Sequence, residues 1–296
     1  MGSGVSLVNS SGGNPAGFEF NEDYGVIVSK FDPGFPEVRN VEDARPHQHG
    51  MVNYTKFFGA REVNIEFMVI PAMNKLGMNR RKIMDDLRAL LNPGLTVYLK
   101  EEIDGTPLRR IRVVPGQFSM PFEFVNRNSC QISWRAPDGF WEADEQQEIF
   151  VPPTPVIAPD TGGRTYSLHG GADRAYSPGS NPTGGISLTN AGNVEAYPLI
   201  RMYGPCVDAS IINVTRNEQM VFVALNLSAG QWVDVNLRDR TALQMSDINQ
   251  SVYSKINWAT STWIRFQTGI NSILYTPTTY TVGTTQAIVF YRDNWI

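Results

Sequence analysis

Two histidines at close spacing are the first candidates for chemistry in this sequence. His47 and His49 form an H-x-H motif, and imidazole nitrogens bind metal ions such as Zn²⁺. Glu42 or Asp43 could add a carboxylate ligand. No third ligand follows at a suitable spacing, so we expect a solvated pair of loop histidines and neither a metal nor another cofactor. His169 lies in a polar segment and is expected to be exposed as well.

Carboxylates are the second group, because paired acids can cleave glycosidic bonds or bind a cation. Asp85 and Asp86 fall on the polar side of a predicted helix, where a solvated face is the expected outcome. Four further acids follow a tryptophan and precede a proline-rich segment, and we expect them to be solvated: Glu142, Asp144, Glu145 and Glu148. We therefore assign no catalytic residue and predict that the protein is not an enzyme.

Tryptophans are the third group, because indole rings can stack on sugar rings. Trp134, Trp232 and Trp263 fall within predicted strands, where packing in the core is the default. Trp141 and Trp258 lie at strand ends and are better placed for exposed contacts. Trp258 is the residue that we single out as a candidate saccharide contact.

Several protein classes are excluded by motif and charge. The sequence contains no G-x-x-x-x-G-K, G-x-G-x-x-G or G-x-S-x-G motif. Its 25 basic and 29 acidic residues give a net charge of −4, and the longest basic cluster covers only residues 80–82. Such a chain lacks the basic groove of a nucleic-acid-binding protein. No apolar run reaches the roughly 18 residues that span a bilayer. We expect no membrane partner, no sequence-specific nucleic-acid partner, and buried thiols rather than a disulfide at Cys130 and Cys206.

Hydrophobic periodicity predicts one strand and one helix clearly in the first half. Apolar residues alternate with polar ones over residues 61–70, which indicates a half-buried strand. Between residues 79 and 92 the apolar residues recur at helical spacing, Asn79 is a plausible N-cap, and Asn-Pro-Gly ends the pattern. The apolar positions are Ile83, Leu87, Leu90 and Leu91. By contrast, residues 41–59 are polar and irregular, and we expect a long loop there.

The composition changes after residue 150. Residues 151–185 are rich in Pro, Gly, Ser and Thr, which is typical of a linker or an extended arm. Residues 186–296 then contain eight short predicted strands separated by turn residues, which favours a β-sandwich. These strands cover residues 186–189, 197–203, 211–215, 220–225, 232–236, 262–267, 271–275 and 287–292.

The predicted fold is therefore mainly β, and the 296 residues suggest two domains. We expect an α+β N-terminal domain over residues 1–150, with one helix and a β-hairpin. The linker or arm follows at 151–185, and a C-terminal β-sandwich covers 186–296. We also expect this last segment to fold on its own, because few contacts should cross the linker.

The order of these features resembles the distal tail protein family of long-tailed, non-contractile bacteriophages. In the first half the resemblance rests on the strand at 61–67 (REVNIEF), the helix end at 90–94 (LLNPG), the Asp-Gly turn at 104–105, the strand at 109–114 (RRIRVV) and residues 136–138 (APD). In the second half it rests on residues 190–193 (NAGN), 201–205 (RMYGP), 227–230 (LSAG) and 291–295 (YRDNW). The motifs are individually loose, but their order extends over both halves of the chain.

The resemblance implies a structural virion protein, made in the host cytoplasm and located at the tail tip. It implies a ring-forming N-terminal domain and a galectin-like C-terminal sandwich, with six copies joining the tail tube protein to tail-tip, baseplate and host-adsorption proteins. The alternative is a carbohydrate-binding module that reads host cell-wall saccharides. We expect no tight binding of simple sugars, because most tryptophans lie at core positions.

Overall fold

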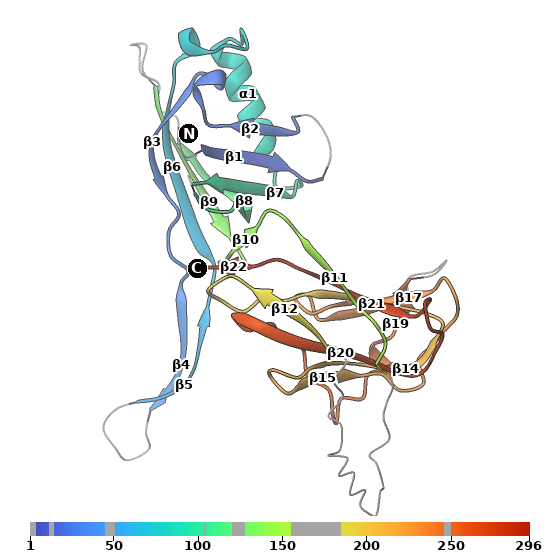
Figure 1. Ribbon diagram of the computed structural model, residues 1–296. Helices are drawn as coiled ribbons and strands as arrows, with labels where there is room; N and C mark the ends of the chain where they lie inside the picture. The colour runs from blue at the N-terminus through green and yellow to red at the C-terminus, as the bar shows by residue number, and fades with distance from the viewer. Residues whose placement is uncertain are drawn as a thin grey trace, which may run out of the picture. The chain divides into compact units, whose positions relative to one another are not determined.

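The computed structural model describes residues 4–11, 15–44, 51–103, 105–119, 128–154, 185–245 and 250–296. The chain forms two units: unit 1 contains residues 1–145 and 294–296, and unit 2 contains residues 146–293. In the described part of the chain, strands predominate and a single α-helix is present (Figure 1). The prediction of a mainly β fold is confirmed.

Unit 1 is built on an antiparallel sheet with strand order β2-β1-β7-β8-β9-β6-β3. The long strand β8 joins its two halves, because its first residues pair with β7 and its later residues pair with β9. A short strand, β10 (Trp141–Ala143), pairs with β8 and with β22 (Asn294–Trp295). The remaining strands are β1 (Gly4–Asn9), β2 (Gly17–Glu19), β3 (Val26–Asp32), β6 (Arg61–Val69), β7 (Val97–Glu102), β8 (Arg109–Ser119) and β9 (Asn128–Ala136). Two 3-10 turns, Glu22–Tyr24 and Pro71–Met73, lie in its connections.

The predicted helix is present as α1 (Arg80–Leu90). Asn79 caps it, since its side-chain oxygen accepts a hydrogen bond from the Lys82 backbone N–H (2.9 Å). Ile83 and Leu87 are fully buried and belong to the same core cluster as the alternating residues of β6. Figure 1 shows α1 beside β2. The 3.6-residue period thus predicted both the helix and its buried face.

The expectation of a loop at residues 41–59 is wrong. β4 (Val38–Ala44) and β5 (Met51–Phe58) form an antiparallel hairpin, with a register shift between Val41 and Glu42. Its backbone groups pair across the hairpin, so strand structure here does not require one apolar face toward a core. The alternation of polar and apolar residues is therefore weak. The β-branched and aromatic residues at positions 38, 41, 52, 54, 57 and 58 carried the available signal.

Unit 2 contains two antiparallel sheets around one core. The first has the order β11-β21-β13-β17-β18-β19, and the second has the order β12-β20-β14-β15, with β16 paired to β14. Buried side chains of both sheets form a single hydrophobic cluster. The strands are β11 (Gln147–Val151), β12 (Ile186–Asn190), β13 (Leu199–Tyr203), β14 (Cys206–Asn213), β15 (Glu218–Val221), β16 (Asn226–Leu227), β17 (Trp232–Asn236), β18 (Thr241–Met245), β19 (Gln250–Ser251), β20 (Gly269–Tyr280) and β21 (Gln286–Tyr291).

Two details of unit 2 differ from the sequence expectations. Residues 147–154 belong to unit 2 rather than to a preceding domain or linker: β11 pairs with β21, and Val151 is fully buried. Residues 262–267 are not a regular strand, because in this segment only an isolated bridge between Ala196 and Phe266 is formed. Cys130 and Cys206 are buried thiols in different units, as predicted, and burial raises the pKa of both.

Candidate functional site

The β4–β5 hairpin extends unit 1 beyond its sheet. Within the described residues, β4 and β5 pair only with each other, as a two-stranded sheet of their own. Figure 1 shows the hairpin leaving the sheet of unit 1 where β3 ends and β6 begins. Two strands without a covering layer are marginally stable in water. Such an element gains stability when its faces or edges contact another protein.

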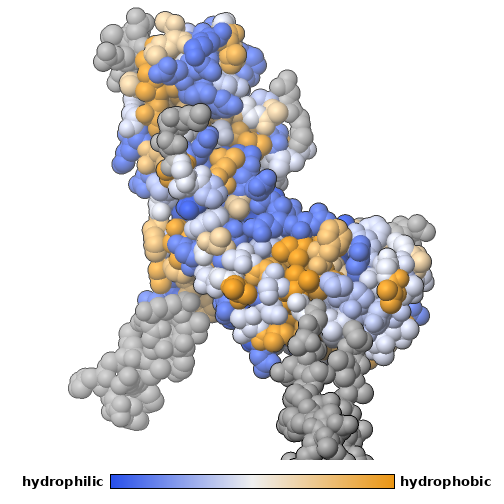
Figure 2. Space-filling model, in the orientation of Figure 1, coloured by the Kyte–Doolittle hydropathy of each residue, from blue (hydrophilic) through white to orange (hydrophobic). Residues whose placement is uncertain are grey.

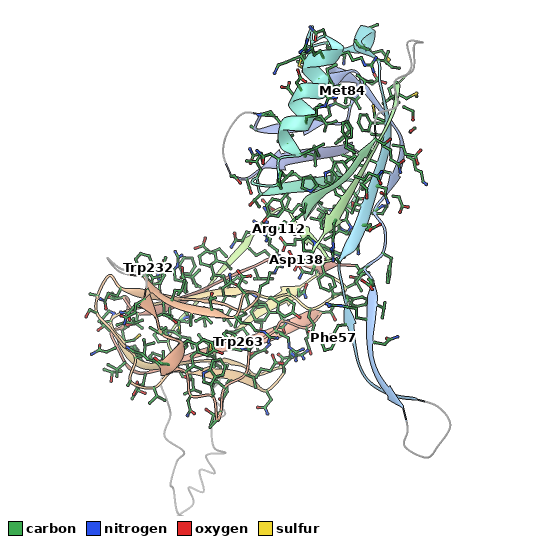
Figure 3. The ribbon with its side chains drawn as sticks, turned by 180° about the vertical axis from the view of Figure 1, so that it is seen from behind. Phe57, Met84, Arg112, Asp138, Trp232 and Trp263 are labelled. Atoms are coloured by element: carbon green, nitrogen blue, oxygen red, sulfur yellow. The ribbon has the colours of Figure 1, made fainter. Side chains whose placement is uncertain are left out.

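Large apolar side chains are exposed where the hairpin begins. We call this surface the hairpin patch, and it consists of Phe35, Val38, Phe57 and Phe58, which are 64%, 46%, 54% and 39% exposed. Figure 3 labels Phe57 at the base of the hairpin, and Figure 2 shows apolar surface gathered there. The ring of Phe58 packs edge-on against Phe35 (6.2 Å between centroids) and against Phe140 (5.9 Å). A cluster of exposed aromatic rings is typical of a surface that contacts another protein.

The base of the hairpin is fixed to unit 1 by backbone contacts. The Glu37 N–H donates to the Ala60 carbonyl (3.0 Å), and the Gly59 N–H donates to the Glu37 carbonyl (2.6 Å). Gly139 has a φ of 71°, and a Cβ at this position would lie 2.3 Å from the Gly59 carbonyl oxygen. Only glycine therefore allows the 137–140 turn to approach the hairpin so closely. The base of the hairpin, where the hairpin patch lies, is therefore held in a fixed position on unit 1.

An open hollow adjoins the hairpin patch. Its volume is about 430 Å³, and its lining carries both basic and acidic side chains beside apolar ones: Glu37, Arg39, Ala60, Val114, Arg135 and Pro137. Such a mixed lining suits contact with a protein surface better than enclosure of a small apolar ligand.

Trp258 lies in a second exposed group of rings, on unit 2. We call Tyr253, Trp258 and Trp263 the aromatic cluster. The ring centroids of Tyr253 and Trp258 are 4.7 Å apart, and those of Trp258 and Trp263 are 5.4 Å apart. Tyr253 is 46% and Trp258 40% exposed, whereas Trp263 is half-buried and packs against the core. Trp263 was expected in the core, and the structure makes it the base of an exposed stack.

An ion-pair network holds the end of the segment that carries these rings. Arg265 pairs with Glu218 (2.9 Å) and with Glu195 (3.1 Å), and Arg216 also pairs with Glu218 (3.0 Å). Burial raises the pKa of Glu218, but hydrogen bonds from the Arg265 backbone and side chain and from Arg216 lower it more, and the net pKa lies below its ordinary value. Glu218 is therefore ionised and anchors the segment to β15.

The structure pairs two of the acids that we expected to be solvated. Glu142 is buried on β10 and lies 3.6 Å from Arg110, and Asp144 contacts Lys100 (2.7 Å). Glu145 and Glu148 are exposed, as expected. The reason for the difference is that β10 pairs with β8, which brings the basic residues of two neighbouring strands against the acids.

The two acidic residues of the helix also differ in exposure: one is solvated, as expected, and the other is largely buried. Asp85 is 53% exposed and lies near Arg81 and Arg88, as a solvated residue would. Asp86 is only 18% exposed and pairs with Lys82 one turn earlier. These are structural ion pairs on the helix surface rather than an acid and base pair for catalysis.

The remaining predicted residues are placed as follows. Trp134 is buried in the core of unit 1, as expected, and Trp232 is half-buried beside Tyr203 and Arg201. Trp141 was considered for exposed contacts, but it is buried (2% exposed), because β22 returns to cover it. His47, His49 and His169 lie outside the described residues, as do the side chains of Glu42 and Asp43. Sequence reasoning missed the hairpin patch, whose signal was the run of aromatic residues at 54–58.

Two further properties hold for the described residues alone. There, no group of three or more His, Cys, Asp or Glu side chains is arranged to hold a metal ion. The single described α-helix is too short and too polar to cross a membrane.

Comparison with known proteins shows a shared fold without sequence similarity. Neither the protein-family models nor the curated proteins match this sequence. Among solved structures, the chain is similar to the SPP1 Dit (gp 19.1) protein, described as a paradigm of the hub adsorption apparatus in phages that infect Gram-positive bacteria. The TM-score is 0.62 at 10% identity, and the alignment covers 99% of both chains.

Two structures of the phage p2 baseplate in its activated conformation are also similar. The one with Sr gives a TM-score of 0.52 at 10% identity, and the one with Ca gives 0.51 at 9% identity. Each alignment covers 99% of this chain and 98% of the other. The structural neighbours are thus phage hub and baseplate proteins, and the likeness includes both units.

Proposed function

We propose that this protein is a structural component of a bacteriophage tail tip, the distal tail hub. In this role it forms a ring of six copies that joins the tail tube to tail-tip or baseplate proteins and to host-adsorption proteins. The observation that carries the proposal is the fold match to the SPP1 Dit protein over 99% of the chain. A match that includes both units, in the same chain order, is more specific than a match to a single β domain.

The hairpin patch supports assembly, and we propose a second copy of the chain as its partner. In a closed ring, each protomer presents one surface to a different surface of its neighbour. The hairpin and its exposed phenylalanines offer the first of these surfaces. Unit 1 also has sheet edges at β2 and β3 that no described strand covers, and strand addition at such an edge is a common mode of recognition.

The role that we infer is structural rather than catalytic. Two of the four acidic residues that follow Trp141 pair with basic neighbours, Glu142 with Arg110 and Asp144 with Lys100. Carboxylates held in this way stabilise the pairing of neighbouring strands. As a tail-tip component, the protein would be made in the host cytoplasm and would reside in the virion.

The mass of the assembled full-length chain tests the proposal. Six copies of a 33.0 kDa chain give about 198 kDa. Light scattering and negative-stain images, with and without the neighbouring tail proteins, should show this mass and a ring with a central hole. Monomers under every assembly condition, or a closed dimer, would contradict the proposal.

A further inference from the structure

Two rings of the aromatic cluster of unit 2 are exposed, and the role of a tail hub does not require exposed rings at this position. Large rings that serve only packing are normally buried, yet Tyr253 and Trp258 are 46% and 40% exposed. We propose that Tyr253, Trp258 and Trp263 form a platform that binds the flat face of a pyranose ring in a neutral oligosaccharide. This inference goes beyond the hub role and does not depend on ring assembly.

The platform is built on a rigid base. The Asn257 N–H donates to the Val221 carbonyl (2.9 Å), the Thr262 N–H donates to the Gln219 carbonyl (2.7 Å), and the Val223 N–H donates to the Lys255 carbonyl (2.8 Å). These bonds attach residues 253–263 to β15 and the residues after it. The segment is therefore ordered before a ligand arrives, which reduces the entropy lost on binding.

Buried side chains hold the same segment from below. Val252, Ile256 and Ile264 are 1%, 5% and 0% exposed and belong to the core cluster of unit 2. Trp263 packs against that cluster, and Trp258 and Tyr253 stack outward from it. Trp258 neighbours both of the other rings, and Tyr253 and Trp258 keep 46% and 40% of their surface exposed. Figure 3 labels Trp263, the innermost of the three rings.

The surroundings of the platform favour a neutral, hydroxyl-rich ligand. Between residues 250 and 263 the only charged side chain is Lys255, and the exposed residues include Ser254, Thr260 and Thr262. Gln219 donates to the Thr260 carbonyl (3.1 Å), which leaves its side-chain oxygen as an acceptor at the rim. At the end of the segment, Arg216 and Arg265 are paired with Glu195 and Glu218, so their charges are balanced. With Lys255 as the remaining basic residue of the segment, there is no basic surface of the kind that nucleic acid or an anionic membrane requires. Apolar rings surrounded by neutral hydrogen-bonding groups match the two faces of a sugar.

The structure also removes the reason for which tight sugar binding was not expected from the sequence. Tight sugar binding was not expected, because most tryptophans, Trp263 among them, were assigned to core strands and no segment clearly offered both an exposed aromatic platform and flanking polar groups. Residues 262–267 do not form that strand, and Trp263 lies beneath Trp258 instead of within a sheet. The segment therefore combines exposed rings with a polar rim.

Calorimetric titration of the full-length protein with chitotetraose and maltotetraose tests the proposal. We expect saturable binding of at least one of the two probes. Trp258→Ala should weaken it about tenfold, the loss of one aromatic contact. Trp258→Phe, which keeps a ring, should weaken it less. Phe150→Ala removes another exposed ring of unit 2 (56% exposed) and serves as the matched control, with unchanged affinity expected.

Unfolding midpoints separate binding from folding. If Trp258→Ala does not fold, Tyr253→Ala removes an exposed ring and tests the same point. No binding of either tetrasaccharide by the unmodified protein would overturn the proposal. Equal affinities of the cluster variants and Phe150→Ala would also overturn it.

Discussion

Trp141 and Trp295 lie directly opposite each other on the antiparallel strands β10 and β22. The chain leaves unit 1 after Glu145, forms all of unit 2, and returns so that its last residues pair with β10. Trp295 is 9% exposed, and the Arg109 guanidinium lies 4.4 Å from the centre of its ring. The C-terminal strand is thus part of the core of unit 1, although about 150 residues separate it from β10 in sequence.

The first prediction concerns this strand. Trp295→Ala should lower the free energy of unfolding of unit 1 by about 3 kcal/mol, because it removes a buried indole and its contact with Arg109. Urea unfolding of the full-length protein measures the change. Trp258→Ala is the control and should have a much smaller effect, since Trp258 is 40% exposed. Equal effects of the two substitutions would contradict the assignment of β22 to unit 1.

Leu87 provides a test of the helix. It is 0% exposed on α1 and shares a core cluster with Val63 and Ile65. Leu87→Ala should cost about 2–5 kcal/mol, because the cavity can collapse only partly. Leu76→Ala, at a 56% exposed position, is the control. An unchanged unfolding midpoint for Leu87→Ala would show that the apolar side of the helix faces solvent or a partner.

The limits of the C-terminal domain can be tested with two fragments. Residues 146–293 include β11, whose Val151 is 0% exposed and whose backbone pairs with β21. Residues 186–296 lack that strand and include Trp295, which packs in unit 1. We propose that the first fragment unfolds cooperatively and is the more stable of the two. If the 186–296 fragment is as stable as the 146–293 fragment, the domain boundary at residue 186 that was expected from the sequence is supported instead.

Acid should weaken the network around Glu218. The folded-state pKa of this carboxylate lies below its ordinary value of 4.5, so its contribution to stability is present above that pH and is lost as the pH falls through the folded-state pKa. Between about pH 5 and about pH 3, the unfolding free energy of the unmodified protein should fall more steeply than that of Glu218→Gln. Parallel curves would show that Glu218 does not carry this pH dependence.

Phe57 tests the assembly surface. It is 54% exposed, so Phe57→Asp should leave the unfolding midpoint of the monomer nearly unchanged. The same substitution places a charge in the proposed contact between copies and should abolish the ring mass. Val282→Asp, at an 84% exposed position of unit 2, is the control. Rings formed by Phe57→Asp as readily as by the control would exclude the hairpin patch as the contact.

Elements whose burial is set locally could be predicted from the sequence. The residues of α1 repeat every 3.6 positions and those of β6 every two, because each element packs one face against a core. The hairpin of β4 and β5 lacked such a signal. Its strands are stabilised by pairing with each other, and this leaves little trace in the spacing of apolar residues.

The exposure of individual tryptophans, by contrast, could not be predicted from the sequence. Sequence position at a strand end suggested exposed contacts for both Trp141 and Trp258, yet the first is buried and the second is exposed. Trp141 is buried where β10 pairs with β22, which places Trp295 directly opposite it. Trp258 stays exposed because its neighbours Tyr253 and Trp263 stack beside it without covering it.

By itself, the sequence determined that this protein is mainly β, with one amphipathic helix and two buried thiols, and that it has no G-x-x-x-x-G-K, G-x-G-x-x-G or G-x-S-x-G motif. These properties follow from residue type and from periodicities of two and 3.6, which depend on neighbours along the chain. Only the tertiary structure decided that the last residues complete unit 1, that β11 belongs to unit 2, and that Trp263 supports Trp258. The first two depend on contacts between residues far apart in sequence, and the third depends on the hydrogen bonds that attach residues 253–263 to β15. No local pattern encodes such contacts.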